Sequence, residues 1–178
     1  MADLKSSHLN PPPSRLLAEV ENAEKRQEFV EISELLFFAY RDFTSDPDAI
    51  LADFEFGRAH HRIIHFVGRH PGISVAALLD ILTITKQSLA RVLKQLTLEG
   101  FIEQKTGSRD RRQRLLHLTP EGIALERRLS TPQHERILHA LSETTPHERA
   151  TFRSILLKMV NKETHAKITK LFASGHIT

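Results

Sequence analysis

The sequence predicts a mainly α-helical fold, a winged helix-turn-helix in which helices are combined with a small antiparallel β-wing and flanked by N- and C-terminal dimerisation helices. Apolar residues recur at helical spacing through most of the chain. Residues 73–122 contain two short helical patterns followed by two strand patterns. The loop between these strand patterns is rich in arginine.

The charge of the chain is distributed unevenly, although its net value of +3 is modest. Residues 1–56 carry five Lys and Arg against twelve Asp and Glu, a net charge of −7. Residues 86–114 carry eight Lys and Arg against three Asp and Glu, a net charge of +5. This asymmetry indicates a polyanion-binding surface on the second segment. A basic face that is merely solvated would have the same composition, so the charge alone does not establish that this surface binds a polyanion.

Several classes of protein are excluded or disfavoured by composition. The chain has no cysteine, which excludes disulfides, thiolate metal sites and thiol redox switches. No apolar run approaches the ~20 residues of a membrane-spanning helix, and the N-terminus lacks the apolar core of a signal peptide. We therefore expect a cytoplasmic protein that makes no membrane contact. Without a Gly-rich phosphate loop or a nucleophile elbow, neither an enzyme nor a cofactor is predicted.

The N-terminal part is predicted to contain one long helix after a flexible arm. Residues 1–15 are polar and include three consecutive prolines, which is typical of an extended arm. Residues 16–41 contain no helix breaker, and their apolar face is unusually wide. It comprises Phe29, Ile32, Leu35, Leu36, Phe37, Phe38 and Tyr40. A face this wide needs cover, for example from a second copy of the chain. The polar run at 44–48, which includes Pro47, predicts a break before a short helical turn at 48–55.

The central lobe begins with a helix at residues 56–67, which Gly68 and Pro71-Gly72 are expected to end. Ser74 is the predicted cap of a helix at 75–82, and Thr85 that of a helix at 86–98. Strands are predicted at 101–105 and 114–118. The intervening residues are too many and too charged for a tight turn, so they project as a wing.

The C-terminal part is predicted to form further helices. Thr119-Pro120 opens the first of them, and Pro132 either kinks it or starts a new helix. Thr145 and Glu148 form a capping box that opens the last helix. Its apolar stripe runs from Phe152 to Val160, and Ile168, Leu171 and Phe172 extend it.

The helix at 86–98 has two chemically different faces. Leu89, Val92, Leu93 and Leu96 are spaced to face the core. The exposed side carries residues that bind base edges and phosphates in a DNA major groove. We expect Gln87, Ser88 and Arg91 to read bases, and Lys86 and Lys94, together with the hydroxyls of Thr83 and Thr85, to bind phosphates.

The wing carries Arg109, Arg111, Arg112 and Arg114 around a single Asp110. Arginine at a hairpin tip suits a narrow minor groove, where the electrostatic potential is most negative. An acidic residue does not bind phosphate, so Asp110 is expected to hold a neighbouring arginine in place.

These residues carry a resemblance to a known family. The wing Asp110-Arg111-Arg112 is followed by Leu116-His117-Leu118-Thr119-Pro120-Glu121-Gly122, and the helix at 86–98 is preceded by Leu78-Leu79-Asp80-Ile81-Leu82. In these motifs the segment 73–122 resembles the MarR family of bacterial winged helix-turn-helix transcriptional regulators. Residues 57–62 and 86–91 further look like its PetP-type branch.

The resemblance implies a homodimer that binds a pseudo-palindromic DNA operator, usually as a repressor. It implies N-terminal dimerisation helices at 16–56, a DNA-binding winged helix-turn-helix lobe at 57–122 and C-terminal dimerisation helices at 123–178. It further implies that Arg112 enters the minor groove with Asp110 as its partner.

Release from DNA by a small aromatic or anionic effector is also implied by the resemblance. By position, the effector pocket would include Phe37, Tyr40, Arg41, Thr44, His61, Arg62 and His65. The alternative is that the aromatic residues form the dimer core and that Arg62 pairs with an acidic residue.

Two other functions stay open at this point. His61 and His65 are four residues apart on one helix, a spacing that can share a zinc ion in a metal-responsive regulator. No third ligand is identifiable, so no metal site is assigned. An architectural DNA-binding protein without an effector would share the same motif but bind without sequence preference.

Overall fold

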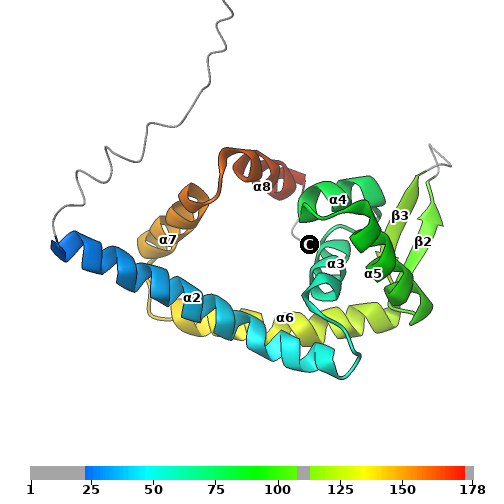
Figure 1. Ribbon diagram of the computed structural model, residues 1–178, viewed down its shortest axis with the longest axis horizontal. Helices are drawn as coiled ribbons and strands as arrows, with labels where there is room; N and C mark the ends of the chain where they lie inside the picture. The colour runs from blue at the N-terminus through cyan, green and yellow to red at the C-terminus, as the bar shows by residue number, and fades with distance from the viewer. Residues whose placement is uncertain (1–22, 108–112, 175–178) are drawn as a thin grey trace, which may run out of the picture. The chain divides into compact units, whose positions relative to one another are not determined.

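The computed structural model describes residues 23–107 and 113–174 (Figure 1). The chain divides into two units, residues 1–42 and 43–178. Helix α2 (Ala23–Ala52) crosses this division. The predicted fold class is confirmed, since the described part is mainly helical with one small antiparallel sheet. None of the helices within the described ranges is long and apolar enough to cross a membrane.

The described part of the first unit is the beginning of α2. Its wide apolar face is exposed, with Phe37 66% exposed and Tyr40 58% exposed. This exposure agrees with the prediction that the face needs cover. Within the helix, the ring of Phe37 meets that of Phe38 edge-on, with centroids 5.5 Å apart.

The predicted break at residues 44–48 is wrong, because α2 continues through Pro47. Proline has no N–H, so Pro47 cannot donate to the carbonyl of Phe43 four residues earlier. The side chain of Gln133 donates to that carbonyl instead, with Nε2 3.1 Å from the oxygen. A second element thus supplies the donor that the proline lacks, and the helix is not interrupted.

The second unit continues from the end of α2 through α3 (Arg58–Arg69), β1 (Ile73–Ser74), α4 (Val75–Leu82) and α5 (Lys86–Leu98). Strands β2 (Ile102–Thr106) and β3 (Arg114–Leu118) follow, and then α6 (Pro120–Leu141), α7 (Pro146–Met159) and α8 (Lys162–Ser174). Helix α3 continues through Gly68, which was expected to end it. The sheet order is β1-β3-β2, and all of its pairs are antiparallel. The two-residue strand β1 was not predicted, since two residues show no alternation.

The core of the second unit lies under α5 and the sheet. Its fully buried side chains come from α2, α3, α4, α5, both wing strands and α6: Leu51, Ile63, Ile64, Val67, Leu78, Leu89, Leu96, Ile102, Leu116 and Leu129. Burial of this apolar surface fixes the position of α5, because every other element of the lobe contributes to the same cluster.

The start of α6 is packed tightly against the wing strands. The N–H of Thr119 donates to the carbonyl of Phe101 at 3.1 Å, and its hydroxyl donates to the carbonyl of Gly100 at 2.6 Å. A Cβ atom on Gly122 would lie 2.0 Å from the Phe101 oxygen. Only glycine fits at this position, which explains why Thr119 is followed by a glycine three residues later.

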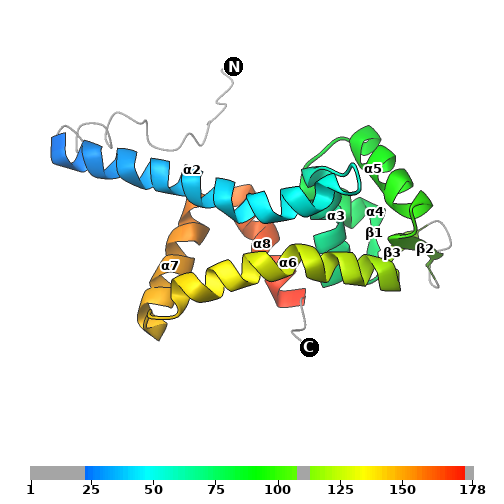
Figure 2. The ribbon, with the colours of Figure 1, turned by 90° about the horizontal axis from the view of Figure 1, so that it is seen from below.

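Helix α6 also continues through a proline, Pro132 (Figure 2). Thr131 does not cap a new helix, since its hydroxyl donates back to the carbonyl of Arg127 at 2.7 Å. The alternative of a new helix starting at this proline is therefore excluded. The C-terminal stripe, in contrast, is divided between two helices, because Val160 adopts an extended conformation after α7.

Candidate nucleic-acid interface

Helix α5 has the two faces that its sequence predicts. Leu89, Val92, Leu93 and Leu96 are at most 4% exposed. The N-cap residue of the helix is Thr85, whose hydroxyl oxygen accepts from the N–H of Ser88 at 3.2 Å. The predicted cap is thus confirmed, and it places the polar residues of the first turn at the helix N-terminus, where backbone N–H groups attract anions.

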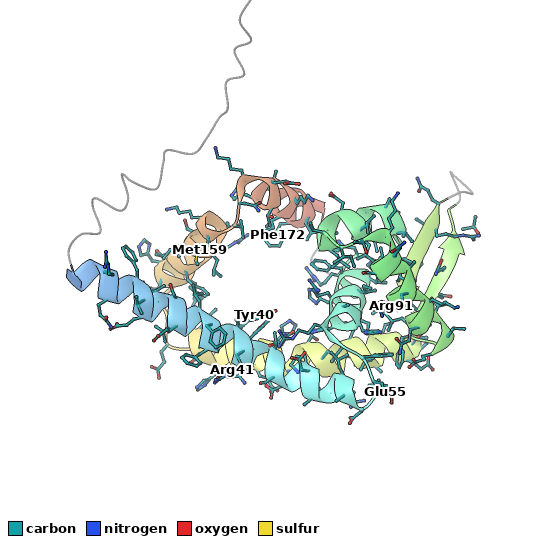
Figure 3. All side chains as sticks on the ribbon, viewed as in Figure 1. Tyr40, Arg41, Glu55, Arg91, Met159 and Phe172 are labelled. Atoms are coloured by element: carbon teal, nitrogen blue, oxygen red, sulfur yellow. The ribbon has the colours of Figure 1, made fainter. Side chains whose placement is uncertain are left out.

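The opposite face of α5 is polar and exposed to solvent. It presents Lys86, Gln87, Ser88, Ala90, Arg91 and Lys94, and Thr83 and Thr85 are exposed beside it. Figure 3 labels Arg91 on this helix. No ion pair joins Lys86, Arg91 or Lys94 to another residue of the described ranges. The structure therefore brings the predicted contact residues of α4 and α5 together on one accessible surface.

A side-chain network holds α5 against α3. The N–H of Gly57 donates to Nδ1 of His60 at 3.0 Å, so the ring hydrogen lies on Nε2. Nε2 lies 2.9 Å from Oε1 of Gln95 on α5 and donates to it. The ring of His60 also stacks on Phe56, with centroids 4.4 Å apart. This link between the two helices was missed from the sequence, since His60 and Gln95 are 35 residues apart.

The turn between α4 and α5 is short and strained. Thr83 has φ 51° and ψ 45°, a left-handed conformation that β-branched residues rarely adopt. The N–H of Thr83 donates to the carbonyl of Leu79 at 3.0 Å and closes the end of α4. Thr85 follows two residues later, so the end of one helix directly determines the start of the other.

The base of the wing is an antiparallel pair in which Thr106 lies opposite Arg114. Nη1 of Arg114 donates to the hydroxyl of Thr106 at 3.1 Å. Arg114 therefore connects the two strands where the wing begins. Arg109, Asp110, Arg111 and Arg112 lie outside the described residues, and their roles at the wing tip stay predictions.

The residues predicted to bind an effector are divided between the two units. Phe37, Tyr40 and Arg41 belong to the first, whereas Thr44, His61, Arg62 and His65 belong to the second. Thr44 is only 8% exposed, and its hydroxyl accepts from Nη2 of Arg58 at 3.2 Å. The pocket that these seven residues would form stays a prediction.

A polar cluster joins α3 to α6. Nδ1 of His65 lies 3.8 Å from Oε1 of Glu126, and the interaction with His65 holds the pKa of Glu126 below its usual value. Burial lowers the pKa of the neighbouring His61. No group of three or more His, Cys, Asp or Glu side chains in the described ranges is arranged to hold a metal ion. The spacing of His61 and His65 therefore gains no third ligand in that part of the chain.

Lys167 of α8 makes another contact that could not be predicted from the sequence. Its Nζ lies 2.9 Å from Oδ1 of Asp80 on α4. The two residues are 87 positions apart, so no local signal connects them.

The chain resembles known proteins over most of its length. The model of the MarR family matches residues 55–113. Over 128 residues the chain is 49% identical to the HTH-type transcriptional regulator PetP of Rhodobacter capsulatus. The aligned segment covers 72% of this chain and 77% of that protein. This match agrees with the resemblance to the PetP-type branch in residues 57–62 and 86–91.

Solved structures share the fold at low sequence identity. The structure of FabT of Streptococcus pneumoniae in complex with DNA matches with a TM-score of 0.64 at 19% identity. The matched part covers 74% of this chain and 94% of the FabT chain. A SlyA-like transcription regulator from Listeria monocytogenes has a TM-score of 0.60 at 18% identity, covering 82% and 96%. The similar proteins are transcription regulators and not enzymes, as expected from the sequence. The chain belongs to the MarR family of winged helix-turn-helix transcriptional regulators.

Proposed function

We propose that this regulator binds a pseudo-palindromic DNA operator as a homodimer and represses transcription until a small aromatic or anionic effector releases it. The observation that carries the DNA part is the exposed polar face of α5 above its buried leucine face. The names of similar proteins support it, because one is an HTH-type transcriptional regulator and another was solved in complex with DNA.

The proposed contacts follow from the position of each side chain. Gln87, Ser88 and Arg91 are exposed on the first two turns of α5 and read base edges. Lys86 and Lys94 bind phosphates at either side of them. Thr83 and Thr85 add neutral donors to phosphate, and Arg112, held by Asp110, enters the minor groove.

The proposal of a homodimer rests on exposed apolar side chains near both ends of the chain. On α2 these are Phe29, Ile32, Leu35, Leu36, Phe37, Phe38 and Tyr40. On α7 they are Phe152, Ile155, Leu156 and Met159. Large apolar faces of this kind are covered in stable proteins, and a second copy of the chain provides a matching face. Residues 16–56 and 123–178 are accordingly assigned to dimerisation, and residues 57–122 to DNA binding.

The proposed effector lies among Phe37, Tyr40, Arg41, Thr44, His61, Arg62 and His65. The chemistry of these side chains supports this assignment, since aromatic rings with arginine and histidine suit a carboxylate or phenolate on an aromatic ring. A panel of aromatic acids added to the protein–operator complex tests the idea, with release at constant salt as the expected result.

The experiment that tests DNA reading begins with selection of bound duplexes from a random pool. Fluorescence anisotropy at one fixed salt concentration then compares the selected operator with a scrambled duplex. Arg91→Ala should weaken operator binding by about 1–3 kcal/mol and scrambled binding much less. Arg127→Ala is the matched control, because Arg127 is also exposed but lies on α6. Equal losses of Arg91→Ala on both duplexes would contradict the base-reading role.

A further inference from the structure

The C-terminal end of α4 carries no positive charge of its own. The last carbonyl groups of a helix lack N–H partners and bear partial negative charge, which a nearby cation stabilises. Helix α4 has no basic residue in its last turn. The carbonyl of Asp80 lies in that last turn, because the helix ends at Leu82.

Lys167 of α8 provides the missing cation. Its Nζ donates to the carbonyl oxygen of Asp80 at 3.0 Å and lies 2.9 Å from the Oδ1 atom of the same residue. Glu163, one turn earlier on α8, lies 3.7 Å from the same Nζ. The side-chain hydrogen bond to Asp80 raises the pKa of Lys167, and the lysine is charged at neutral pH even without this shift. Figure 1 shows α8 beside α4.

This contact lies at the turn that leads into α5. A hollow of about 530 Å³ is lined by Asp80, Thr83, Thr85 and Lys167, among others. The carbonyl of Asp80 that accepts from Lys167 also faces the Thr83 hydroxyl at 3.5 Å. Thr85 is the N-cap residue of α5, so a shift at the end of α4 is passed on to the first turn of α5.

We propose that Lys167 is a positioning residue for DNA binding: it closes the C-terminal end of α4 and thereby holds residues 83–88 in the conformation that meets DNA. The proposal rests on the proposed function, because it concerns the same interface. Lys167 acts through Asp80 and the turn, and it does not itself bind phosphate.

Three variants separate this role from a simple loss of charge. Lys167→Met removes the charge and keeps the length of the side chain. Lys167→Arg keeps a donor that can reach both oxygens of Asp80. Lys162→Met removes the same charge from the exposed first turn of the same helix and is the matched control.

Two measurements are made on the full-length protein. Hydrogen exchange of the free protein follows the backbone amides of residues 83–88. Anisotropy with the selected operator follows affinity as a function of salt concentration. We expect faster exchange in Lys167→Met and roughly three- to tenfold weaker binding, since a cation at a helix end makes a modest contribution. Lys167→Arg should restore both values, and Lys162→Met should resemble the wild-type chain.

The salt dependence and the exchange measurement together distinguish positioning from direct contact. Loss of one lysine that itself binds phosphate reduces the slope of log affinity against log salt by about 0.9 and leaves exchange in the turn unchanged. A displaced turn speeds this exchange, whatever its effect on the phosphate contact of Lys86 in the same segment. A reduced slope with unchanged exchange would overturn the proposal, and so would identical behaviour of Lys167→Met and Lys162→Met. If no operator preference exists at all, the proposed function fails, whereas the exchange measurement still decides whether Lys167 holds the turn.

Discussion

At the scale of single residues, two positions show how tightly the DNA-binding lobe is specified. Gly122 lies where a Cβ atom would meet the carbonyl oxygen of Phe101 at 2.0 Å. Thr83 is held in a left-handed conformation at the turn before α5. Both positions lie on segments that connect an interface element to the core, so small changes there alter the placement of α5 or of the wing.

Gly122→Ala should therefore destabilise the protein. The backbone oxygen of Phe101 cannot move away without breaking its bond from the N–H of Thr119. We expect the free energy of unfolding to fall by about 2–4 kcal/mol, the upper range for added atoms in a packed site. Urea denaturation at one protein concentration measures this loss. Gly57→Ala is the control, since no atom lies within 4 Å of a Cβ there. Equal stability of the two variants would contradict the steric argument.

At the scale of elements, the position of α5 depends on more than its leucine face. The bond from His60 to Gln95 joins α3 to α5, and Gln95 donates in turn to Glu99 at 3.0 Å. The hydroxyl of Thr85 caps the helix from within its own sequence. Local capping thus starts α5, whereas a contact from a distant helix fixes its orientation.

A double-mutant cycle measures the link between α3 and α5. His60→Ala and Gln95→Ala should each lower the free energy of unfolding, and the double variant should lose less than the sum of the two. The expected coupling is about 0.5–1.5 kcal/mol, the net value of one hydrogen bond. The pair His60→Ala and Gln104→Ala serves as control, because Gln104 is exposed on β2. Additive losses for His60 and Gln95 would show that the bond does not contribute.

The wing makes a separate prediction. If Asp110 serves only to orient Arg112, then Asp110→Ala and Arg112→Ala should weaken operator binding alike, by about 1–2 kcal/mol each. The double variant should lose no more than either single one. Anisotropy with the selected operator measures all three, with Arg111→Ala as a control for the loss of wing charge. Wild-type affinity of Asp110→Ala would refute the orienting role.

At the scale of the whole molecule, the proposed homodimer accounts for one observation and one part of the proposed function. The apolar faces of α2 and α7 are exposed, and the proposed pseudo-palindromic operator would require two α5 helices at a fixed separation. The described part of one chain has a single α5. Dimerisation is therefore proposed to set operator spacing as well as stability.

A charge on the apolar face of α2 tests this assignment. Leu36→Asp should convert the protein to monomers at micromolar concentration, because an unpaired carboxylate in an apolar interface is costly. Operator affinity should fall by at least roughly 100-fold as the second half-site is lost. Sedimentation velocity and anisotropy measure the two effects. Glu34→Lys alters the charge of the same helix on its polar side and should stay dimeric. A dimeric Leu36→Asp variant would place the interface elsewhere.

The amino-acid sequence by itself determined the elements whose signals are local. The caps Ser74, Thr85 and Thr145, the leucine face of α5 and the strand pair were all predicted from neighbours within a few residues, and all are confirmed. The exposed polar face of α5 follows from the same periodicity. The family resemblance was likewise carried by motifs within residues 73–122. The match to the MarR family model and the identity with PetP support it.

Only the tertiary structure shows where a contact between distant residues replaces a local sequence signal. Helix α2 passes through Pro47 because Gln133, 90 residues away, donates to the carbonyl that the proline leaves without a donor. Lys167 donates to the carbonyl of Asp80 in the last turn of α4, 87 residues away. His60 bonds to the side chain of Gln95 on α5, 35 residues away. The physical reason is the same in each case. A backbone carbonyl or a side-chain amide accepts a hydrogen bond from any donor that the fold brings within reach, and sequence separation carries no information about that donor.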